Sequence, residues 1–196
     1  MASVAVADTR DAQGRTEIRV VRRKPPLRVH LPRLSENEKR DLSLDEPDEA
    51  ARTALAGRAR YEGYGKHKRN LHLWNLAAFH GYAPDRTFCE DVGFERRDEQ
   101  RIPVLLHRGI AAGLFGDLHR QGDPTMLWTI DDNGWIYEMR QTNSGQALYH
   151  GYPMAPTNAL GRKVIARFET WIFSFPREER DPALLAALRD AQDRYS

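Results

Sequence analysis

The clearest pattern in the chain is an alternation of hydrophobic and polar residues between residues 125 and 152. Thr125–Ile130 and Trp135–Thr142 show the period of two that is typical of strands, and they flank Asp131-Asp132-Asn133-Gly134. Asn-Gly favours a type I′ hairpin turn, because both central residues of that turn need a positive φ. A second turn at Asn143-Ser144-Gly145 leads into a third strand, Gln146–Tyr152. The sequence therefore predicts a three-stranded antiparallel meander, with room for a fourth strand.

Helical periodicity appears on both sides of this meander. Residues 98–115 carry hydrophobic side chains at helical spacing, with Pro103 in the first turn, where a missing N–H costs least. A second helix is expected from a Thr157 cap to Phe173, and Asp181-Pro182 is a typical start for a third. The order of helix, meander and two closing helices predicts an α+β fold, with helices packed on one face of a small sheet. The other face would stay open, and we expect a site there.

Simple pairing through Asn133-Gly134 places Ile130 opposite Tyr137 and Trp128 opposite Met139. These four side chains then form the core face of the hairpin. Side chains two residues apart in a strand share a face, so Glu138 and Arg140 would lie together on the second, more polar face.

The second turn leaves two registers open for the third strand. A two-residue loop at Ser144-Gly145 would put Tyr149 beside Arg140 and turn His150 towards the core. A three-residue loop with a glycine bulge would instead put His150 beside Arg140. Because a one-residue shift moves every side chain of a strand to the other face, the loop length decides which of the two side chains joins the polar face.

Residues 1–55 form a separate zone in composition, and we predict a flexible charged arm there followed by a single α+β domain at residues 56–196. Residues 19–33 contain six basic residues and no acidic one, whereas residues 36–49 contain seven acidic residues. Charge blocks of this kind with few hydrophobic residues seldom form a packed core. Ile18–Val21 indicates a short strand within the arm.

Bulk composition excludes some classes of protein. The formal net charge of +2 does not by itself require a nucleic-acid partner. Cys89 is the single cysteine, so an internal disulfide is impossible, and a buried thiol is a more probable role for it than a nucleophile. The chain shows no secretion signal and no membrane span, so we expect a cytoplasmic protein, with delivery by a signal-less secretion system left open. No spaced set of metal ligands is present, and we expect neither a metal nor a cofactor.

A glutamate, an arginine and a histidine on one sheet face are the groups that a metal-independent ribonuclease needs. Glu138 would accept the 2′-hydroxyl proton, and His150 or His67 would protonate the leaving 5′-oxygen. Arg140 would stabilise the charge that develops on phosphorus. RNA supplies its own nucleophile, so neither a metal nor a covalent intermediate is required. A solvated ion pair of Glu138 with Arg140, and a histidine at the rim of the core, are the plain structural alternatives.

A second candidate site is the loop Gly63-Tyr64-Gly65-Lys66-His67-Lys68-Arg69. Glycines let a backbone approach a phosphate, and Lys66, Lys68 and Arg69 would bind it. Aromatic side chains stack on bases, which suggests the same substrate-binding role for Tyr64 and Tyr149. A solvated basic turn is the alternative interpretation of this loop.

Two stretches carry a resemblance to a known group of proteins. They are Tyr61-Glu62-Gly63-x-Gly65-Lys66-His67-Lys68, followed by Phe88-Cys89-Glu90-Asp91, and Trp135-Ile136-Tyr137-Glu138-x-Arg140 with Tyr149-His150-Gly151-Tyr152-Pro153. This pattern resembles small bacterial domains found at the ends of polymorphic toxins or beside defence genes. The layout is also similar to that of barnase-like and RelE-like toxin nucleases, a fold-level analogy from which the long arm and the two closing helices depart.

These observations lead to three hypotheses. The first is a ribonuclease-like toxin or effector that acts on RNA or another phosphate-bearing substrate and is held by a cognate inhibitor or a partner from a neighbouring gene. The second is a non-catalytic regulatory module that binds nucleic acid or protein. The third is an enzyme for a small phosphorylated or nucleotide ligand.

Overall fold

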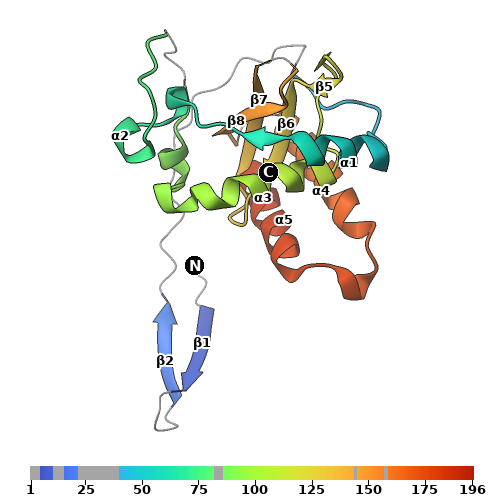
Figure 1. Cartoon of the computed structure of the whole chain (residues 1–196). Helices are drawn as coiled ribbons and strands as arrows, with labels where there is room; N and C mark the ends of the chain where they lie inside the picture. Colours follow the sequence, from blue (N-terminus) through green and yellow to red (C-terminus); the bar gives the residue numbers. More distant parts are fainter. Residues whose placement is uncertain (1–4, 11–15, 22–39, 82–85, 144, 157–158) are drawn as a thin grey trace. The chain divides into compact units, whose positions relative to one another are not determined.

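The computed structural model describes residues 5–10, 16–21, 40–81, 86–143, 145–156 and 159–196 (Figure 1). The chain divides into two compact units, residues 1–30 and residues 31–196. In the first unit, β1 (Ala5–Arg10) and β2 (Thr16–Val21) pair antiparallel. The strand expected at residues 18–21 lies within β2, whereas its partner β1 was not predicted. Most of the basic block after residue 21 and the predicted Thr157 cap lie outside the described residues.

The second unit has an α+β fold around a four-stranded sheet of order β3-β8-β7-β6. The predicted antiparallel meander is confirmed for β6, β7 and β8. The expectation of a purely antiparallel sheet was wrong, because β3 pairs in parallel with β8 and makes the sheet mixed. Two residues are too few to show a hydrophobic period, so sequence patterns missed β3. The strands are β3 (Arg60–Tyr61), β6 (Met126–Ile130), β7 (Ile136–Asn143) and β8 (Leu148–Pro153).

Helices precede and follow the meander, as expected. The first predicted helix is shorter than residues 98–115, because residues 96–101 form a 3-10 helix and the α-helix begins only at Ile102, with Pro103 in its first turn. Among the described residues, no helix combines the length and apolar character needed to cross a membrane. The helices are α1 (Glu49–Arg58), α2 (Leu71–Trp74), α3 (Ile102–Ala111), α4 (Ala159–Phe173) and α5 (Pro182–Tyr195), and a small separate sheet contains β4 (His119–Arg120) and β5 (Asp123–Pro124).

The folded unit includes residues that composition assigned to the arm. Helix α1 spans the expected boundary at residue 56, and the Asp48 side chain caps it by accepting a hydrogen bond from Ala51 N. Leu42 and Leu55 are both buried. The acidic block therefore leads into a capped helix that begins at its last residue, Glu49, which net charge alone did not indicate.

The first hairpin has a longer loop than Asn-Gly suggested. Gly134 N donates to Asp131 O at 3.0 Å and Gly134 has a φ of 74°, so a type I turn is followed by a left-handed glycine. The Asp131 carboxylate accepts the N–H groups of Asn133 and Trp135. This loop shifts the pairing by one residue, and Trp128 lies opposite Glu138 instead of Met139. The predicted pairing was therefore wrong, and Glu138 shares a face with tryptophan and isoleucine side chains.

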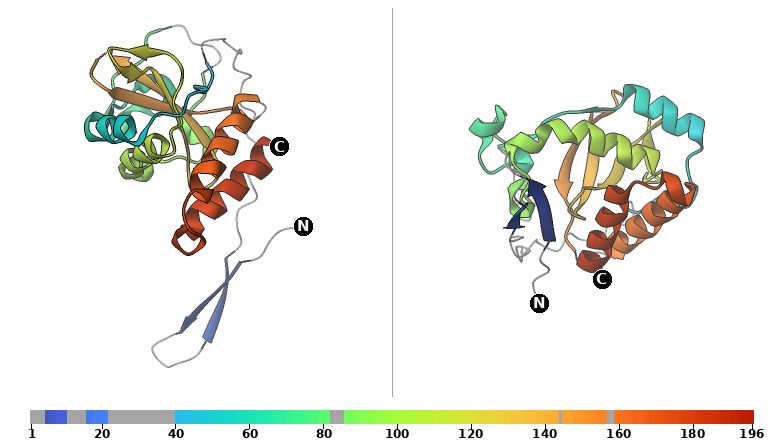
Figure 2. Two further views of the ribbon diagram at one scale, coloured as in Figure 1. Left: turned by 90° about the vertical axis from the view of Figure 1, so that its right-hand side faces the viewer. Right: turned by 90° about the horizontal axis from the view of Figure 1, so that it is seen from below.

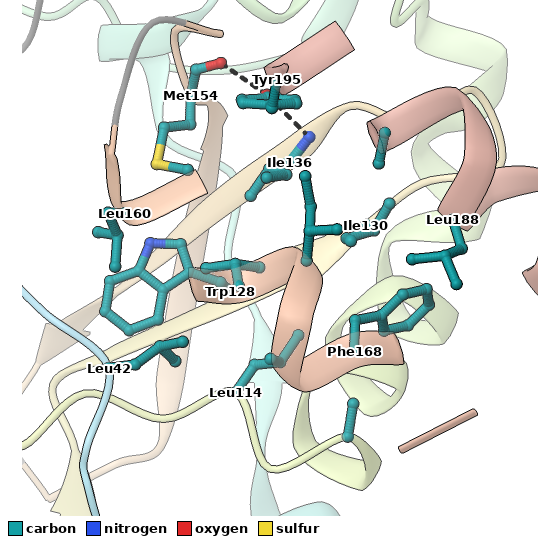
Figure 3. Packing of buried hydrophobic residues seen from close by; sticks show 14 of the residues in the cluster. Leu42, Leu114, Trp128, Ile130, Ile136, Met154, Leu160, Phe168, Leu188 and Tyr195 are labelled. Carbon is teal, nitrogen blue, oxygen red and sulfur yellow. Dashed lines mark hydrogen bonds between the residues drawn. The ribbon is translucent and has the colours of Figure 1, made fainter. Parts of the chain in front are cut away.

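Helices cover both faces of the sheet, which corrects the expectation of one open face. On the face that carries Trp128 and Ile136, helices α4 and α5 form a hydrophobic core through side chains such as Phe168 and Leu188 (Figure 3). Helix α3 packs on the opposite face, where Gly109 lies against the β6 backbone (Figure 2). The core runs along the whole of β6 on this face, from Met126 to Ile130. The same face of β7 and β8 carries the polar side chains described next.

Candidate functional site

Two cross-strand pairs bring the predicted polar side chains together. Arg140 lies opposite His150, and Glu138 lies opposite Tyr152, so all four side chains share one sheet face. The predicted register that puts His150 beside Arg140 is therefore confirmed, although the bulge lies between Gln141 and Asn143 and not at the glycine of the loop. The alternative, with Tyr149 beside Arg140, does not occur.

Glu138 is the centre of a buried charged network, here called the Glu138 network, that also contains Arg40, Arg140 and Tyr152. One carboxylate oxygen accepts a hydrogen bond from Arg40 Nε, and the other accepts from Arg140 Nε at 2.8 Å and from the Tyr152 hydroxyl. The Glu138 side chain is 0% exposed. Burial alone would raise its pKa, but the two guanidinium groups and the tyrosine outweigh burial and lower it. Glu138 is therefore a buried carboxylate held in its charged form.

This environment does not suit the predicted role of Glu138 as a general base. A base needs direct or water-mediated contact with the proton that it removes. The Glu138 side chain has no exposed surface, and both its oxygens already accept hydrogen bonds from Arg40, Arg140 and Tyr152. The geometry instead gives it the role of fixing Arg140 and Tyr152. Burial and the neighbouring Glu138 charge raise the Tyr152 pKa, so its hydroxyl stays protonated and donates.

Above this network lies a stack of rings formed by His67, Tyr152 and His150. The His67 ring stacks on Tyr152 with centroids 4.2 Å apart and an interplanar angle of 16°, and its centroid is 5.9 Å from that of His150. His67 Nδ1 donates to Thr87 O at 3.0 Å, so its buried Nε2 is an acceptor without a partner among the described residues. The Tyr64 ring also contacts His150, with centroids 4.7 Å apart. Both predicted histidines therefore belong to one group with Tyr64, Arg140 and the Glu138 network, here called the cluster.

Both imidazoles are neutral at neutral pH. Burial lowers the pKa of His67 to about 3, and its hydrogen bond to Thr87 offsets this only in part. Burial also lowers the pKa of His150 to about 4, with further contributions from the positive charges of Arg140 and Lys66. His150 Nδ1 lies 3.1 Å from Thr142 Oγ1, and across the described part of the chain its Nε2 has no hydrogen-bond partner. In the tautomer whose Nδ1 donates to Thr142 Oγ1, the neutral imidazole has a lone pair on Nε2 that can accept a proton.

Lys66 and Arg140 are the cations that act on His150, and Arg86 lies within electrostatic range of Lys66; the three are here called the cationic rim. Burial lowers the pKa of Lys66, and the charges of Arg140 and Arg86 lower it further. The Arg140 side chain is 46% exposed although its Nε is bonded to Glu138. Glu138 already neutralises the buried Arg40, so the cluster has excess positive charge that faces solvent. This charge favours an anion beside His150.

Three predicted substrate-binding residues lie away from the cluster. Lys68 is buried with its ammonium 3.7 Å from the Trp74 ring centroid, and it neighbours the buried thiol of Cys89. Arg69 is exposed and bonds Asp91. Tyr149 is 0% exposed on the opposite sheet face, where its hydroxyl donates to Pro124 O. Of the predicted basic loop, Lys66, His67 and Tyr64 reach the cluster.

Cys89 is the buried thiol that the sequence favoured. Its Sγ lies 3.8 Å from Gly151 O, and burial raises its pKa, which disfavours the reactive thiolate. Among the described residues, no group of three histidine, cysteine or carboxylate side chains converges in a way that could hold a metal ion.

The glycines of the loop have a different function from the one predicted. A Cβ on Gly65 would collide with the carbonyl oxygen of Ala77, and a Cβ on Gly63 would collide with the Leu76 side chain. The glycines therefore let the following segment, residues 76–81, pack against the loop. The close backbone approach is to another part of the same chain.

Sequence reasoning missed Arg40, Arg86, Thr142 and Tyr152. A signal was available for Tyr152, which lies two residues after His150 in the same strand and so on the same face. A similar signal was available for Thr142, which lies two residues after Arg140 in the sequence. Nothing local marked Arg40, because its partner Glu138 is 98 residues away.

Comparison of the chain with protein-family models, with curated proteins and with solved structures finds no match in any of the three. The function must therefore be argued from the geometry of the site.

Proposed function

We propose that the protein is a metal-independent ribonuclease whose active site lies at His150. The observation that supports this most strongly is the neutral His150 imidazole, with its free Nε2, surrounded by the cationic rim. Cations bind a phosphodiester, and a neutral imidazole accepts a hydroxyl proton beside it. RNA carries that hydroxyl next to its phosphate, so the substrate completes the set of reacting groups.

The proposed step is attack of the 2′-oxygen on the adjacent phosphorus. His150 Nε2 accepts the 2′-hydroxyl proton while the bond from phosphorus to the 5′-oxygen breaks. Lys66, whose pKa is lowered from its ordinary value, donates a proton to the departing 5′-oxygen. Arg140 and Arg86 stabilise the extra negative charge on the phosphoryl oxygens. The products are a 2′,3′-cyclic phosphate and a 5′-hydroxyl.

The Glu138 network has a positioning role in this scheme. Glu138 holds Arg140 Nε and leaves the remainder of that half-exposed guanidinium to face the substrate. Tyr152 connects the carboxylate to the His67 ring, and His67 in turn stacks towards His150. The predicted roles are thus reassigned, with His150 as base instead of acid and Glu138 as a support instead of the base.

The test is cleavage of single-stranded RNA in the presence of EDTA by the full chain. We expect products that end in 2′,3′-cyclic phosphate, and His150→Ala should reduce kcat/KM about 100-fold or more. Arg162→Met removes an exposed cation on α4 and is the matched control, with activity unchanged. Intact RNA after long incubation with the wild-type chain would refute the proposal.

The pH profile separates the two possible bases. With His150 as base, kcat/KM is flat through neutral pH and falls only on approach to a pH of about 4, the His150 pKa. At alkaline pH, kcat/KM falls as Lys66 loses its proton, and this fall is centred below pH 10.5 because the Lys66 pKa is lowered from that value. A Glu138→Gln variant that folds but retains the acid limb supports the positioning role, whereas loss of that limb assigns the base to Glu138.

A role as a toxin or effector is the cellular part of the same proposal. Expression of the wild-type chain should slow bacterial growth and degrade cellular RNA, and the His150→Ala variant should do neither. A cognate inhibitor would have to cover the cationic rim, so an acidic surface is the expected chemistry of that partner.

A non-catalytic module that binds nucleic acid is the second candidate. The observation in its favour is that Glu138 is wholly buried and both imidazoles are neutral. Such groups can hold the cationic rim in place for binding an anion without taking part in any reaction. This candidate predicts salt-dependent RNA binding that Lys66→Met weakens, without cleavage by the wild type. Cleavage that depends on His150 excludes it.

A further inference from the structure

A pocket opens directly beside the proposed active site. It has a volume of about 310 Å³ and is formed by the loop at Gly63, Tyr64 and Gly65 on one side and by residues 76–81 on the other. This volume is at the lower end of the roughly 300–1,000 Å³ of small-molecule sites. Gly65 is needed for the two segments to approach this closely, because a Cβ there would collide with the backbone carbonyl oxygen of Ala77. At Gly63 a Cβ would meet only the end of the Leu76 side chain.

Aromatic rings form the part of the pocket that faces the active site. The Tyr64 and Phe79 rings meet edge to face, with centroids 5.9 Å apart and an interplanar angle of 77°. Tyr64 also contacts His150, so one ring is shared by the pocket and the proposed catalytic centre. Lys66 extends over Phe79 at 5.9 Å from the ring centroid. One cation of the rim thus lies at the mouth of an aromatic pocket.

A flat heterocycle attached to an anion fits this combination. Nucleobases stack on aromatic side chains, and the attached phosphate would then lie at Lys66 and Arg140. In a duplex the bases are paired and stacked within the helix, and the grooves of A-form RNA do not present them to a pocket. Only an unpaired nucleotide can place its base between these segments while its phosphate remains at the rim.

We propose that this pocket binds one unpaired nucleobase, the base on the ribose whose 2′-oxygen attacks, and that the substrate class is single-stranded RNA. The inference rests on the proposed function and adds the element that selects the substrate. The edge of the base would meet the exposed His80 and the backbone of residues 77–78, which line the same pocket.

The test uses DNA oligonucleotides that contain a single ribonucleotide, so that only one linkage can be cleaved. One oligonucleotide carries a base on that ribose, a second carries an abasic ribose, and a third is the first annealed to its complement. We expect the wild-type chain to cleave the first about 10- to 100-fold faster than the second or third. In the Phe79→Leu variant the ratio of the base-containing rate to the abasic rate should fall towards one. Leu73→Ala, an exposed leucine outside the pocket, is the control and should keep the wild-type ratio.

The outcomes of this experiment separate the two proposals. Equal cleavage of the base-containing and abasic linkages, or of single and double strands, would overturn the pocket assignment and leave the ribonuclease standing. Absence of cleavage in every oligonucleotide would overturn the ribonuclease, and this inference with it. The comparison within the wild-type chain needs no variant, so a folding defect in Phe79→Leu cannot obscure it.

Discussion

Arg40 offers the sharpest test of the Glu138 network, because it connects residue 40 to a strand near the middle of the chain. Its side chain is 5% exposed, and its Nε donates to a glutamate that is 0% exposed. Removal of one partner from a buried ion pair typically costs about 3–5 kcal/mol. Arg140 and Tyr152 would still satisfy the other carboxylate oxygen, so Arg40→Met should lower the free energy of unfolding by about 3 kcal/mol.

The size of this loss should depend on pH in a defined direction. The folded-state pKa of Glu138 is lowered, so Glu138 stabilises the fold above the unfolded value of about 4.5 and loses this effect as the pH falls through the folded value. Without Arg40 the burial of Glu138 is less well compensated, and its folded-state pKa rises. The difference between wild type and variant is therefore full at pH values above the folded-state pKa of Glu138 in the variant, and it shrinks as the pH falls from that value through the lower wild-type value.

The assay is urea unfolding followed by circular dichroism at pH 7 and at pH 4. A loss of this size corresponds to a decrease in Tm of about 6–12 °C for a chain of this length. Arg97→Met is the matched control, because Arg97 pairs with Glu95 while its side chain is 80% exposed, and surface pairs contribute about 1 kcal/mol or less. If Arg40→Met is as stable as the control, or loses equal stability at both pH values, the proposed role of the network is refuted.

Further predictions address the core, the imidazole stack and the loop. Tyr195→Phe removes a buried hydroxyl that bridges two backbone groups, and should lower the unfolding free energy by about 1–3 kcal/mol in urea titrations. His67 has a folded-state pKa lowered to about 3, so the stability gained by burying the neutral imidazole is fully present above pH 6.5. It is lost as the pH falls from 6.5 towards about 3. His67→Gln should therefore flatten the acid side of a plot of Tm against pH, and an unchanged slope would count against the buried neutral imidazole. Gly65→Ala places a Cβ against the Ala77 carbonyl, and should lower both the Tm and RNA cleavage, while Gly57→Ala, which meets no atom within 4 Å, should lower neither.

Local patterns in the chain were enough for the types of element and for part of the site. Alternation predicted the meander, helical spacing predicted α3, α4 and α5 in outline, and the strand period placed Glu138 and Arg140 on a common face. Such patterns work because each element must bury its own hydrophobic face, and neighbouring residues record that requirement. The candidates Glu138, Arg140, His150 and His67 were found in this way or from the basic loop, and the structure brings all of them together.

Tertiary structure decided the register, the partners and the chemical states. A left-handed glycine at position 134 lengthened the first turn by one residue and moved Glu138 to the face of Trp128, which the residue types alone did not reveal. Arg40 contacts Glu138 across 98 residues of chain, and Lys68 turns to the opposite face from His67 next to it. These outcomes depend on turn geometry and on burial, and burial with its partners is also what keeps one carboxylate charged and two imidazoles neutral. A pattern along the chain carries neither quantity, because both arise only when distant segments pack and exclude water.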